Sequence, residues 1–249
     1  MRRELSEKEI LDTVRDIRHE APGIGAYKLY LMLKELYPDG MRGRDWFYGL
    51  MHESHLMLKL GKRRHTTSSN HPYRKYKNMI KGLTVNRINQ LWVADIDTDE
   101  GVAYLHLLTD AFTHEIIGWV LSDSLVASNT VTALEMGISH VSPLGFDGLI
   151  HHSDRGVQYC CNQYIDRLQA IKATISMTED YKPTDNAIAE RVNGIIKQEW
   201  LYRMKRPPDV VVARDLLGRI IGFYNNRRPQ RSNRDMLPPV RFREALTCM

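Results

Sequence analysis

Apolar residues at the start of the chain recur at helical spacing. In LSEKEILDTVRDIRHE, residues 5–20, they fall near every third or fourth position, and Ser6 is placed to cap a helix. The same spacing returns in AYKLYLMLKELY at 26–37 and in GRDWFYGLMHESHLM at 43–57, after breaks that contain Pro and Gly. We therefore predict a small all-α, helix-turn-helix-like domain over residues 1–58. The alternative is a helical cap that packs on the rest of the chain without contacting DNA.

From residue 88 the pattern changes to short apolar runs rich in β-branched residues, which are typical of strands. Three such runs follow one another with brief turns between them: INQLWVADID, VAYLHLLTD and HEIIGWVLS. Helix and strand patterns then alternate, with helices near 128–140, 160–171 and 184–203 and strands near 146–154 and 173–177. Three meandering strands followed by this alternation predict an α/β core over residues 85–228, with a mixed five-stranded sheet flanked by helices.

Residues 59–84, between the two patterned regions, are polar and basic. No Asp or Glu occurs between Ser54 and Ala94, and nine Lys and Arg residues lie in that interval. Tyr73 and Tyr76 are interleaved with the basic residues and could stack on bases or sugars. We predict a basic linker that follows a phosphate backbone, although a disordered solubilising linker has a similar composition. The candidate DNA contacts in this linker are Arg63, Arg64, Arg74 and Lys75.

The net charge of +5 conceals a segregation of charge along the 249 residues. Residues 1–84 contain 17 Lys and Arg against 10 Asp and Glu, a net charge of +7. Residues 85–170 contain 3 against 11, a net charge of −8, and residues 171–249 contain 15 against 9, a net charge of +6. An acidic centre between basic flanks favours a polyanionic partner held by the flanks, with cations offsetting the centre. Ordinary solvated surface charge is the alternative.

The sequence argues against a membrane protein and against a nucleotide cofactor. No apolar run approaches the ~18 residues of a transmembrane helix, and the charged start MRRELSEKEI is unlike a signal peptide. The glycines at 23–25 and the Gly-Lys pair at 61–62 lack the rest of a dinucleotide or P-loop fingerprint. We therefore expect a cytoplasmic protein with no membrane partner and no nucleotide cofactor.

Cysteine and histidine do not indicate a zinc site. Cys160, Cys161 and Cys248 are odd in number and form no Cys-x-x-Cys motif, so neither a disulfide framework nor a zinc knuckle is supported. His151 and His152 are adjacent in a predicted strand, where neighbouring side chains point to opposite faces. We expect them in structural or hydrogen-bonding roles and not as joint ligands of one metal.

Three carboxylates in distinctive local sequences are the main candidates for chemistry. Asp95 lies in the apolar strand segment WVADIDT, where an acid costs free energy unless it is paired or metal-bound. Asp154 ends a predicted strand in HHSDRGVQY, and Glu190 lies one turn into the predicted long helix. Three acids from three separate elements can hold two divalent ions about 3.5–4 Å apart, as enzymes of phosphoryl transfer do. Because the ligand atoms are all oxygens, we predict two Mg²⁺ ions, for which Mn²⁺ can substitute.

Further polar residues share the faces of these acids. Asp97 lies on the same strand face as Asp95 and could join the metal site. Lys197 follows Glu190 by seven residues, and two helical turns bring both to one face, with Asn193 between them. Lys197 and Asn193 are therefore candidate DNA contacts, with a solvent-facing lysine as the alternative.

Taken together, these segments resemble the catalytic subunit of bacterial insertion-sequence transposases. The type is the DDE transposase with a retroviral-integrase-like, RNase H-like core, translated from a second reading frame. WVADI resembles the Trp-x-x-Asp-Ile strand of that family, and HHSDRGVQY and NAIAERVNGIIKQE match its second and third catalytic blocks. FYNNRRPQRSNRDMLPP resembles its Tyr-Asn-x-x-Arg-Pro-His block, and residues 21–58 resemble its upstream helical module. The resemblance covers nearly the whole chain.

The resemblance implies a role for each matching residue. The implied catalytic metal ligands are Asp95, Asp154 and Glu190. Implied or candidate DNA contacts are Lys197 and, beside the Arg-Pro of the last block, Arg227 and Arg228, followed by a basic C-terminal tail at 229–249. The chain departs from the family in four places: Asp97 replaces a usual Thr, the turn DTDEG is shortened, Gln230 stands where His is usual, and Asn233 stands near a usual Leu.

The resemblance also implies a reaction and its partners. The reaction is cleavage at the 3′ ends of an insertion sequence and transfer of each 3′ hydroxyl into DNA, without a covalent enzyme intermediate or ATP. The partners are the terminal inverted repeats, the target DNA, further copies of the chain on that DNA, and an upstream-frame helix-turn-helix and leucine-zipper protein or fusion. The implied location is the bacterial cytoplasm, at the nucleoid. The chain begins at Met1 without a heptad run, so it could be the short product only.

Three other functions use some of the same features. A metal-dependent nuclease would have the same three acids but would not join DNA strands. An inactive DNA-binding regulator derived from such a transposase would bind DNA without chemistry. An RNA-associated structural module would bind nucleic acid with no dependence on Mg²⁺.

Overall fold

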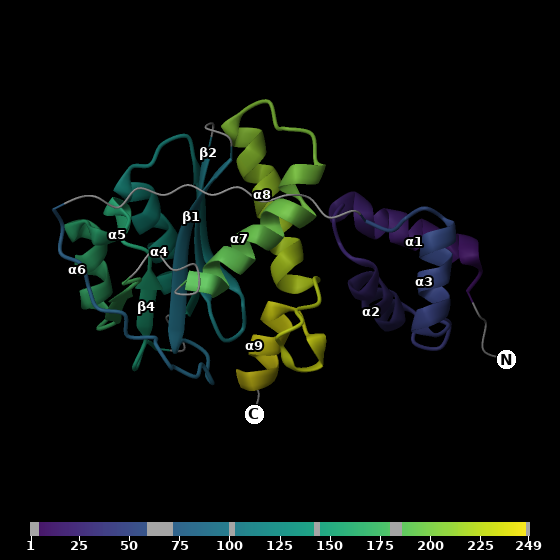
Figure 1. The fold of residues 1–249 in the computed structure, drawn as a ribbon, viewed down its shortest axis with the longest axis horizontal. Coiled ribbons are helices and arrows are strands. Elements are labelled where there is room, and N and C mark those ends of the chain that lie inside the picture. The colour runs from purple at the N-terminus through teal and green to yellow at the C-terminus, as the bar shows by residue number, and fades with distance from the viewer. Residues whose placement is uncertain (1–4, 59–71, 100–102, 142–144, 180–185, 248–249) are drawn as a thin grey trace.

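The computed structural model describes residues 5–58, 72–99, 103–141, 145–179 and 186–247, and a mixed β-sheet lies at its centre (Figure 1). The strands are β1 (Leu91–Asp99), β2 (Ala103–Asp110), β3 (Ile116–Ser122), β4 (Ile150–Ser153) and β5 (Thr174–Met177). Their order across the sheet is β3-β2-β1-β4-β5. The first three strands pair antiparallel, whereas β1 with β4 and β4 with β5 run parallel. The predicted mixed five-stranded sheet is confirmed in the described residues.

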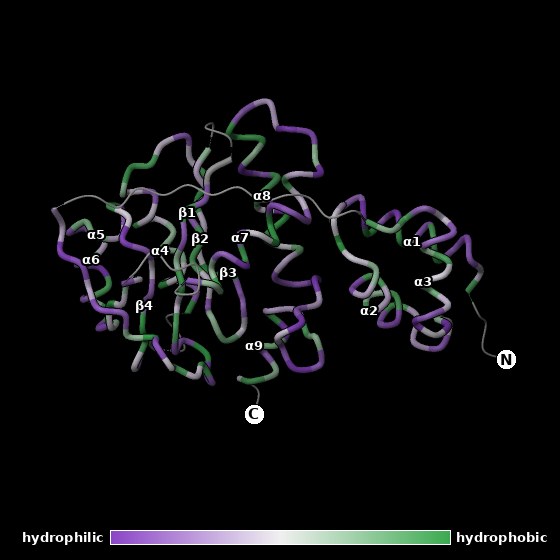
Figure 2. The backbone as a smooth tube through the Cα atoms, viewed as in Figure 1, coloured by the Kyte–Doolittle hydropathy of each residue, from purple (hydrophilic) through white to green (hydrophobic). Residues whose placement is uncertain are grey.

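Helices cover both faces of the sheet. One face is covered by α4 (Ala127–Val141), α5 (Val157–Cys160) and α6 (Asn162–Ala170), and the other by α7 (Ala187–Glu199) and α8 (Val210–Asn226). Side chains alternate between the layers: Trp92 and Ala94 of β1 pack with α4 to α6, whereas Leu105 and Leu107 of β2 pack with α7 and α8. Figure 2 shows hydrophobic residues gathered along the central strands. The same alternation directs Asp95 towards α7.

No helix among the described residues combines the length and the apolar character needed to cross a bilayer.

The contact between β3 and α4 depends on glycine. A Cβ atom at Gly118 would lie 2.0 Å from the carbonyl oxygen of Ala133 in α4. One turn further along α4, a Cβ atom at Gly137 would lie 2.6 Å from the side chain of Leu108 on β2. The missing side chains therefore let the helix backbone reach the sheet, which closes this side of the core.

Three helices precede the sheet, as the sequence pattern predicts: α1 (Glu7–Glu20), α2 (Ala26–Leu36) and α3 (Arg44–Glu53). Residues 5–58 are called the helical module below. Ser6 caps α1 in a capping box, because its side chain accepts from the backbone N–H of Glu9 while the Glu9 carboxylate accepts from the N–H of Ser6. The expected cap and the three expected helices are confirmed.

The helical module packs against the C-terminal end of α7, away from the sheet (Figure 1). The backbone N–H of Gly23 donates to the carbonyl of Glu199 at 2.7 Å, and Nε1 of Trp200 donates to the carbonyl of Glu20 at 2.8 Å. A Cβ atom at Gly23 would lie 2.4 Å from the Cα atom of Glu199. Apolar side chains of the module and of α7 and α8 form a single cluster. This is the packing of a helical cap, and DNA contact by the module stays a prediction.

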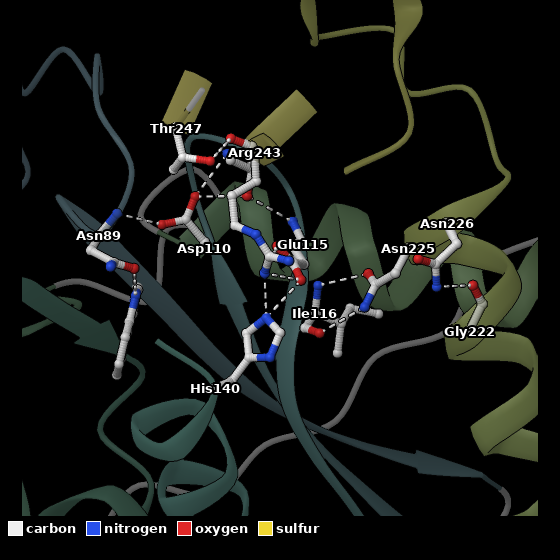
Figure 3. A network of polar contacts seen from close by, with 12 residues as sticks. Asn89, Asp110, Glu115, Ile116, His140, Gly222, Asn225, Asn226, Arg243 and Thr247 are labelled. Atoms are coloured by element: carbon white, nitrogen blue, oxygen red, sulfur yellow. Dashed lines mark hydrogen bonds and ion pairs between the residues drawn. The ribbon is translucent and has the colours of Figure 1, made fainter. Parts of the chain in front are cut away.

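The C-terminal segment is folded onto the core. It contains α9 (Pro239–Thr247), which packs against α8. The rings of Phe112 and Phe242 lie 5.6 Å apart, and Arg243 donates to the buried carboxylate of Glu115 at 2.6 and 2.8 Å (Figure 3). His140 of α4 contacts the same carboxylate. Ring and ion-pair contacts therefore hold the described part of the basic segment 229–249 against the core as a helix.

The Tyr-Asn pair at the end of α8 fastens this helix to the turn between β2 and β3. The hydroxyl of Tyr224 donates to the carbonyl of His114 at 3.0 Å. The side chain of Asn225 pairs with both backbone groups of Ile116, accepting at 3.0 Å and donating at 2.9 Å (Figure 3). The C-terminal sequence block recognised above thus contributes to the fold of the core.

Candidate active site

Asp95, Asp154 and Glu190 come from three elements that meet on the α7 side of the sheet. β1 and β4 are parallel neighbours in which Val93 is paired with His152. Asp95 and Asp154 each follow two residues later, so they stand at the same level on adjacent chains. Glu190 lies in the first turn of α7, the helix that covers this face of β1.

The electrostatic environment of Asp95 includes the other two acids. Burial, and then the charge of Asp154, raise the pKa of Asp95 to about 8, and the charges of Asp97 and Glu190 add to the increase. A hydrogen bond from Asn193 acts in the opposite direction. Asp154 and Glu190 therefore both lie within electrostatic range of Asp95.

Each aspartate at the site also has a partner within the protein. Nδ2 of Asn193 donates to Oδ2 of Asp95 at 2.7 Å, and the backbone N–H of Gly156 donates to Oδ1 of Asp154 at 2.8 Å. Asp97, on the same face of β1 as Asp95, forms an ion pair with Lys197. Within the described part of the chain, no three His, Cys, Asp or Glu side chains converge closely enough to hold a metal ion.

The chemistry of the three acids fits a hard divalent cation. All the ligand atoms are carboxylate oxygens, which Mg²⁺ and Mn²⁺ prefer. Burial and then repulsion raise the pKa of Asp95, and a divalent cation bound between the carboxylates would relieve the repulsion. Asp95, Asp154 and Glu190 are therefore suitable ligands by chemical type.

Besides Lys197, three of the residues predicted to contact DNA have partners inside the protein. Asn193 is buried against the acid of β1. Arg228 is only 3% exposed, and its Nε and Nη2 atoms donate to the carboxylate of Glu199 at 2.8 and 2.9 Å. Arg227 forms an ion pair with Glu20 of α1. Asn193 and Arg228 are thus buried, where one positions the acid of β1 and the other packs against α7, and DNA contact by these two stays a prediction.

The described part of the linker, residues 72–84, runs beside β5. The backbone N–H of Met79 donates to the hydroxyl of Ser176 at 2.8 Å, and that of Asn78 donates to the carboxylate of Glu179 at 3.0 Å. These bonds attach the linker to the parallel half of the sheet. Outside the described residues lie the two other predicted linker contacts, Arg63 and Arg64.

Positive charge from the linker reaches the neighbourhood of Asp154. Burial and the charge of Asp154 raise the pKa of Cys160, to about 11, and the charges of Lys75 and Arg155 act against this increase. Arg74 and Lys75 are both exposed. Lys75, Arg155 and Asp154 thus all lie within electrostatic range of Cys160.

Two buried polar residues beside the acids were not among the sequence-predicted site residues. The hydroxyl of Tyr159 has no hydrogen-bond partner among the described residues, and burial, with nearby charges that include Asp154 and Asp95, raises its pKa well above the usual value. Asn186, which precedes α7, donates from Nδ2 to the carbonyl of Ala94 at 3.1 Å. Both lie within the quoted sequence blocks, and that position is the signal that could have identified them.

The adjacent histidines point to opposite sides of β4, as period-two geometry predicts. Nε2 of His151 lies 2.8 Å from the hydroxyl of Tyr164, and Nδ1 of His152 lies 2.8 Å from the hydroxyl of Ser176. Burial lowers the pKa of His151 to about 3. Their expected hydrogen-bonding role is confirmed.

Comparison with known protein families agrees with this architecture. One family described as an integrase core domain matches residues 85–183, and a second with the same description matches residues 171–239. Together they cover the sheet, all three acids and α8. The sheet order, the acids and these matches define an RNase H-like integrase core, the core of DDE polynucleotidyl transferases. Enzymes with this core generally act with a divalent metal ion.

Related proteins narrow the class to a family. The uncharacterized 31 kDa protein of insertion element IS600 from Shigella sonnei is 33% identical over 81% of this chain and 75% of its own length. The transposase for insertion sequence element IS629 from the same organism is 32% identical over 68% of this chain, but the chain spans only 56% of that protein. The transposase for element IS904 of Lactococcus lactis is 29% identical over 89% of both chains. The chain belongs to the bacterial insertion-sequence transposases of the DDE integrase superfamily.

Solved structures of integrase cores are also similar. One is the HTLV-2 integrase catalytic core domain in complex with magnesium, in its dimeric form. The match covers 56% of this chain and 88% of the integrase chain, at 18% identity and a TM-score of 0.43. The match to the trimeric form of the same domain covers 68% of this chain and 99% of the integrase chain, at 16% identity and a TM-score of 0.48.

Proposed function

We propose that this chain cleaves DNA at the 3′ ends of an insertion sequence and transfers those ends into DNA. Asp95, Asp154 and Glu190 would hold two Mg²⁺ ions, for which Mn²⁺ can substitute. Bound there, the ions would activate the attacking oxygen and stabilise the leaving oxygen of an in-line phosphoryl transfer. The observation that supports this proposal is the electrostatic contact of the three acids, which come from β1, the end of β4 and the first turn of α7.

The protein's own groups orient these acids. Asn193 donates to one oxygen of Asp95 and so fixes the rotation of its carboxylate. The backbone N–H of Gly156 does the same for Asp154. Glu190 stands on a helix whose first turn is tied to β1 by the bond from Asn186 to the carbonyl of Ala94. Ligands held on regular elements in this way need little reorganisation when substrate binds.

The proposed substrate is the phosphate backbone of DNA at the terminal inverted repeats and at the target. Its proposed path follows the basic linker, with contacts from Arg74, Lys75 and the undescribed Arg63 and Arg64, and then Lys197 beside the acids. Two reacting DNA ends favour a homo-oligomer assembled on DNA, with an upstream-frame helix-turn-helix and leucine-zipper segment as a further partner. The reaction uses no nucleotide cofactor, and its DNA places it in the bacterial cytoplasm, at the nucleoid.

The decisive experiment compares Glu190→Gln with wild-type protein on labelled duplexes that carry the inverted repeats flanking the gene. Wild-type protein with Mg²⁺ should cut at the 3′ ends, and Glu190→Gln should lose cleavage while its DNA affinity stays within a few-fold. The matched control is Glu244→Gln, which removes the same charge from an exposed position on α9 and should cleave normally. Mg²⁺-dependent cleavage by Glu190→Gln would contradict the assignment of the acids.

The same assay separates transposition from simple hydrolysis. Products in which a labelled element end is covalently joined to a second DNA are expected from a transposase. Cut but never joined DNA, under conditions where the wild-type protein binds both substrates, would identify a metal-dependent nuclease.

A further inference from the structure

The ion pair between Asp97 and Lys197 lies beside the proposed catalytic acids. Asp97 follows Asp95 by two residues on the same face of β1, and Lys197 lies on the face of α7 that carries Glu190. The side chains of Asp97 and Lys197 are 24% and 17% exposed, so the pair is largely but not fully enclosed. Its partners are 100 residues apart in the chain.

This ion pair borders a cavity. The cavity has a volume of about 260 Å³ and extends from Asp97 and Lys197 to Arg206 in the segment before α8. Its walls are mainly apolar and include Leu105, Leu121 and Leu217. Arg206 is exposed and has no ion-pair partner among the described residues. The cavity therefore offers two cationic groups, one paired and one not, at the edge of the acidic site.

We propose that Lys197 and Arg206 form a binding subsite for a phosphate of the DNA backbone. In the absence of DNA the carboxylate of Asp97 pairs with Lys197, and the DNA phosphate displaces it. This inference rests on the proposed function and adds to it an internal competitor for the substrate. A carboxylate and a phosphate accept the same charge-assisted hydrogen bonds from an ammonium group. Exchange of one for the other keeps Lys197 paired in both states, so its charge is not left unpaired in a partly buried position.

The subsite has a geometric consequence for substrate binding. Lys197 and Glu190 project from one helix face, two turns apart, so a phosphate held by Lys197 lies along α7 from the catalytic acids. Arg206, in the segment that precedes α8, lines the same cavity as Asp97 and Lys197 and would approach the same phosphate from that segment. The two cations would thereby fix the direction in which the backbone leaves the acids.

The test measures the affinity of the full chain for a fluorescein-labelled duplex of random sequence, in EDTA, as a function of salt. Asp97→Asn should tighten binding about fivefold, because DNA no longer has to break the ion pair. Asp215→Asn, which removes one exposed negative charge from α8, is the matched control and should change affinity less than about twofold. Asp97→Thr is the second variant if Asp97→Asn folds poorly, as judged by its thermal melting.

Salt dependence tests the phosphate contacts directly. Lys197→Gln and Arg206→Gln should each lower the slope of log K against log salt by about one, and Lys197→Arg should restore it. Arg219→Gln, an equal charge change at an exposed position on α8, should leave the slope unchanged. Unchanged slopes for Lys197→Gln and Arg206→Gln, or equal effects of Asp97→Asn and Asp215→Asn, would overturn the subsite while leaving the proposed function intact. Wild-type protein that binds no DNA would overturn both.

Discussion

Glu199 should be among the most sensitive positions for stability outside the apolar core. It lies at the C-terminal end of α7 and is 13% exposed in its side chain. Arg228 donates to both of its oxygens at 2.8 and 2.9 Å, and Nζ of Lys28, from the helical module, lies 2.7 Å from Oε1. The perturbation is Glu199→Gln, which keeps the shape of the side chain and removes its charge.

The expected size of the effect follows from burial. Because Arg228 is 4% exposed in its side chain, the substitution leaves a guanidinium enclosed without a counter-charge. Loss of one partner of a buried pair costs about 3–5 kcal/mol of unfolding free energy. For a chain of this size each kcal/mol corresponds to about 2–4 °C in melting temperature, so we expect a decrease of roughly 10 °C.

Lys28 supplies the matched control. Burial, and then repulsion from Arg228, lower the pKa of Lys28 and outweigh the attraction of Glu199, whereas the pKa of Arg228 is raised by Glu199 in spite of burial. Arg228 is therefore the stronger partner, and Lys28→Met should cost less than about 1 kcal/mol. Urea denaturation followed by tryptophan fluorescence measures both variants. A loss below about 1 kcal/mol for Glu199→Gln, or equal losses for the two variants, would refute this reasoning.

The pH dependence has a defined sign. Burial raises the pKa of Glu199, but the hydrogen bonds and charges of Arg228 and Lys28 outweigh burial, so the pKa is lowered overall. The stabilisation is therefore complete above the ordinary value of 4.5 and is lost as the pH falls through the lowered pKa. The difference in stability between wild-type and Glu199→Gln protein should shrink only in that acidic range.

Three further substitutions test other parts of the structure. Gly118→Ala should destabilise the protein by at least about 3 kcal/mol in urea denaturation, because its Cβ would overlap the backbone of α4; a neutral result would mean that β3 and α4 separate at little cost. Asn225→Ala should cost about 2–4 kcal/mol, since it leaves both backbone groups of Ile116 without their side-chain partner, and an unchanged melting temperature would show that water replaces the amide. The double substitution of Arg63 and Arg64 to Gln should lower the salt slope of DNA binding by about two, and an unchanged slope would remove the linker from the DNA path.

For the helices and strands that it indicated, the hydrophobic periodicity of the sequence predicted the type and the order correctly. It did not predict all of their first and last residues. The predicted helix at 184–203 is α7 only over Ala187–Glu199, because Trp200 leaves helical geometry to bury its ring against the helical module. The predicted strand at 146–154 shortens to Ile150–Ser153, because Gly148 adopts a positive φ of 64°. Both ends depend on contacts or backbone angles that a hydrophobic pattern does not encode.

The candidate site shows the same division. Asp95, Asp154 and Glu190 could be selected because each stands in a distinctive segment, and in the structure the charges of Asp154 and Glu190 both act on Asp95. The ion pair of Asp97 with Lys197 was not predictable, because it joins residues 100 positions apart. Arg228 carries a charge that suggests a surface role, yet a glutamate 29 positions earlier in the chain holds it inside. The distribution of charge in the sequence therefore indicated a polyanionic partner. It did not show which Lys and Arg side chains are exposed and available to bind that partner.

The docking of the helical module on α7 has a consequence for assembly. Glu190 and Glu199 lie nine residues apart on one continuous helix, which at 1.5 Å per residue corresponds to about 14 Å. The helix is thus a rigid spacer with the reacting centre near one end and the module attached at the other. If the module binds DNA, that DNA reaches the acids at a fixed distance along α7. This distance would then determine which phosphodiester is placed at the acids for cleavage.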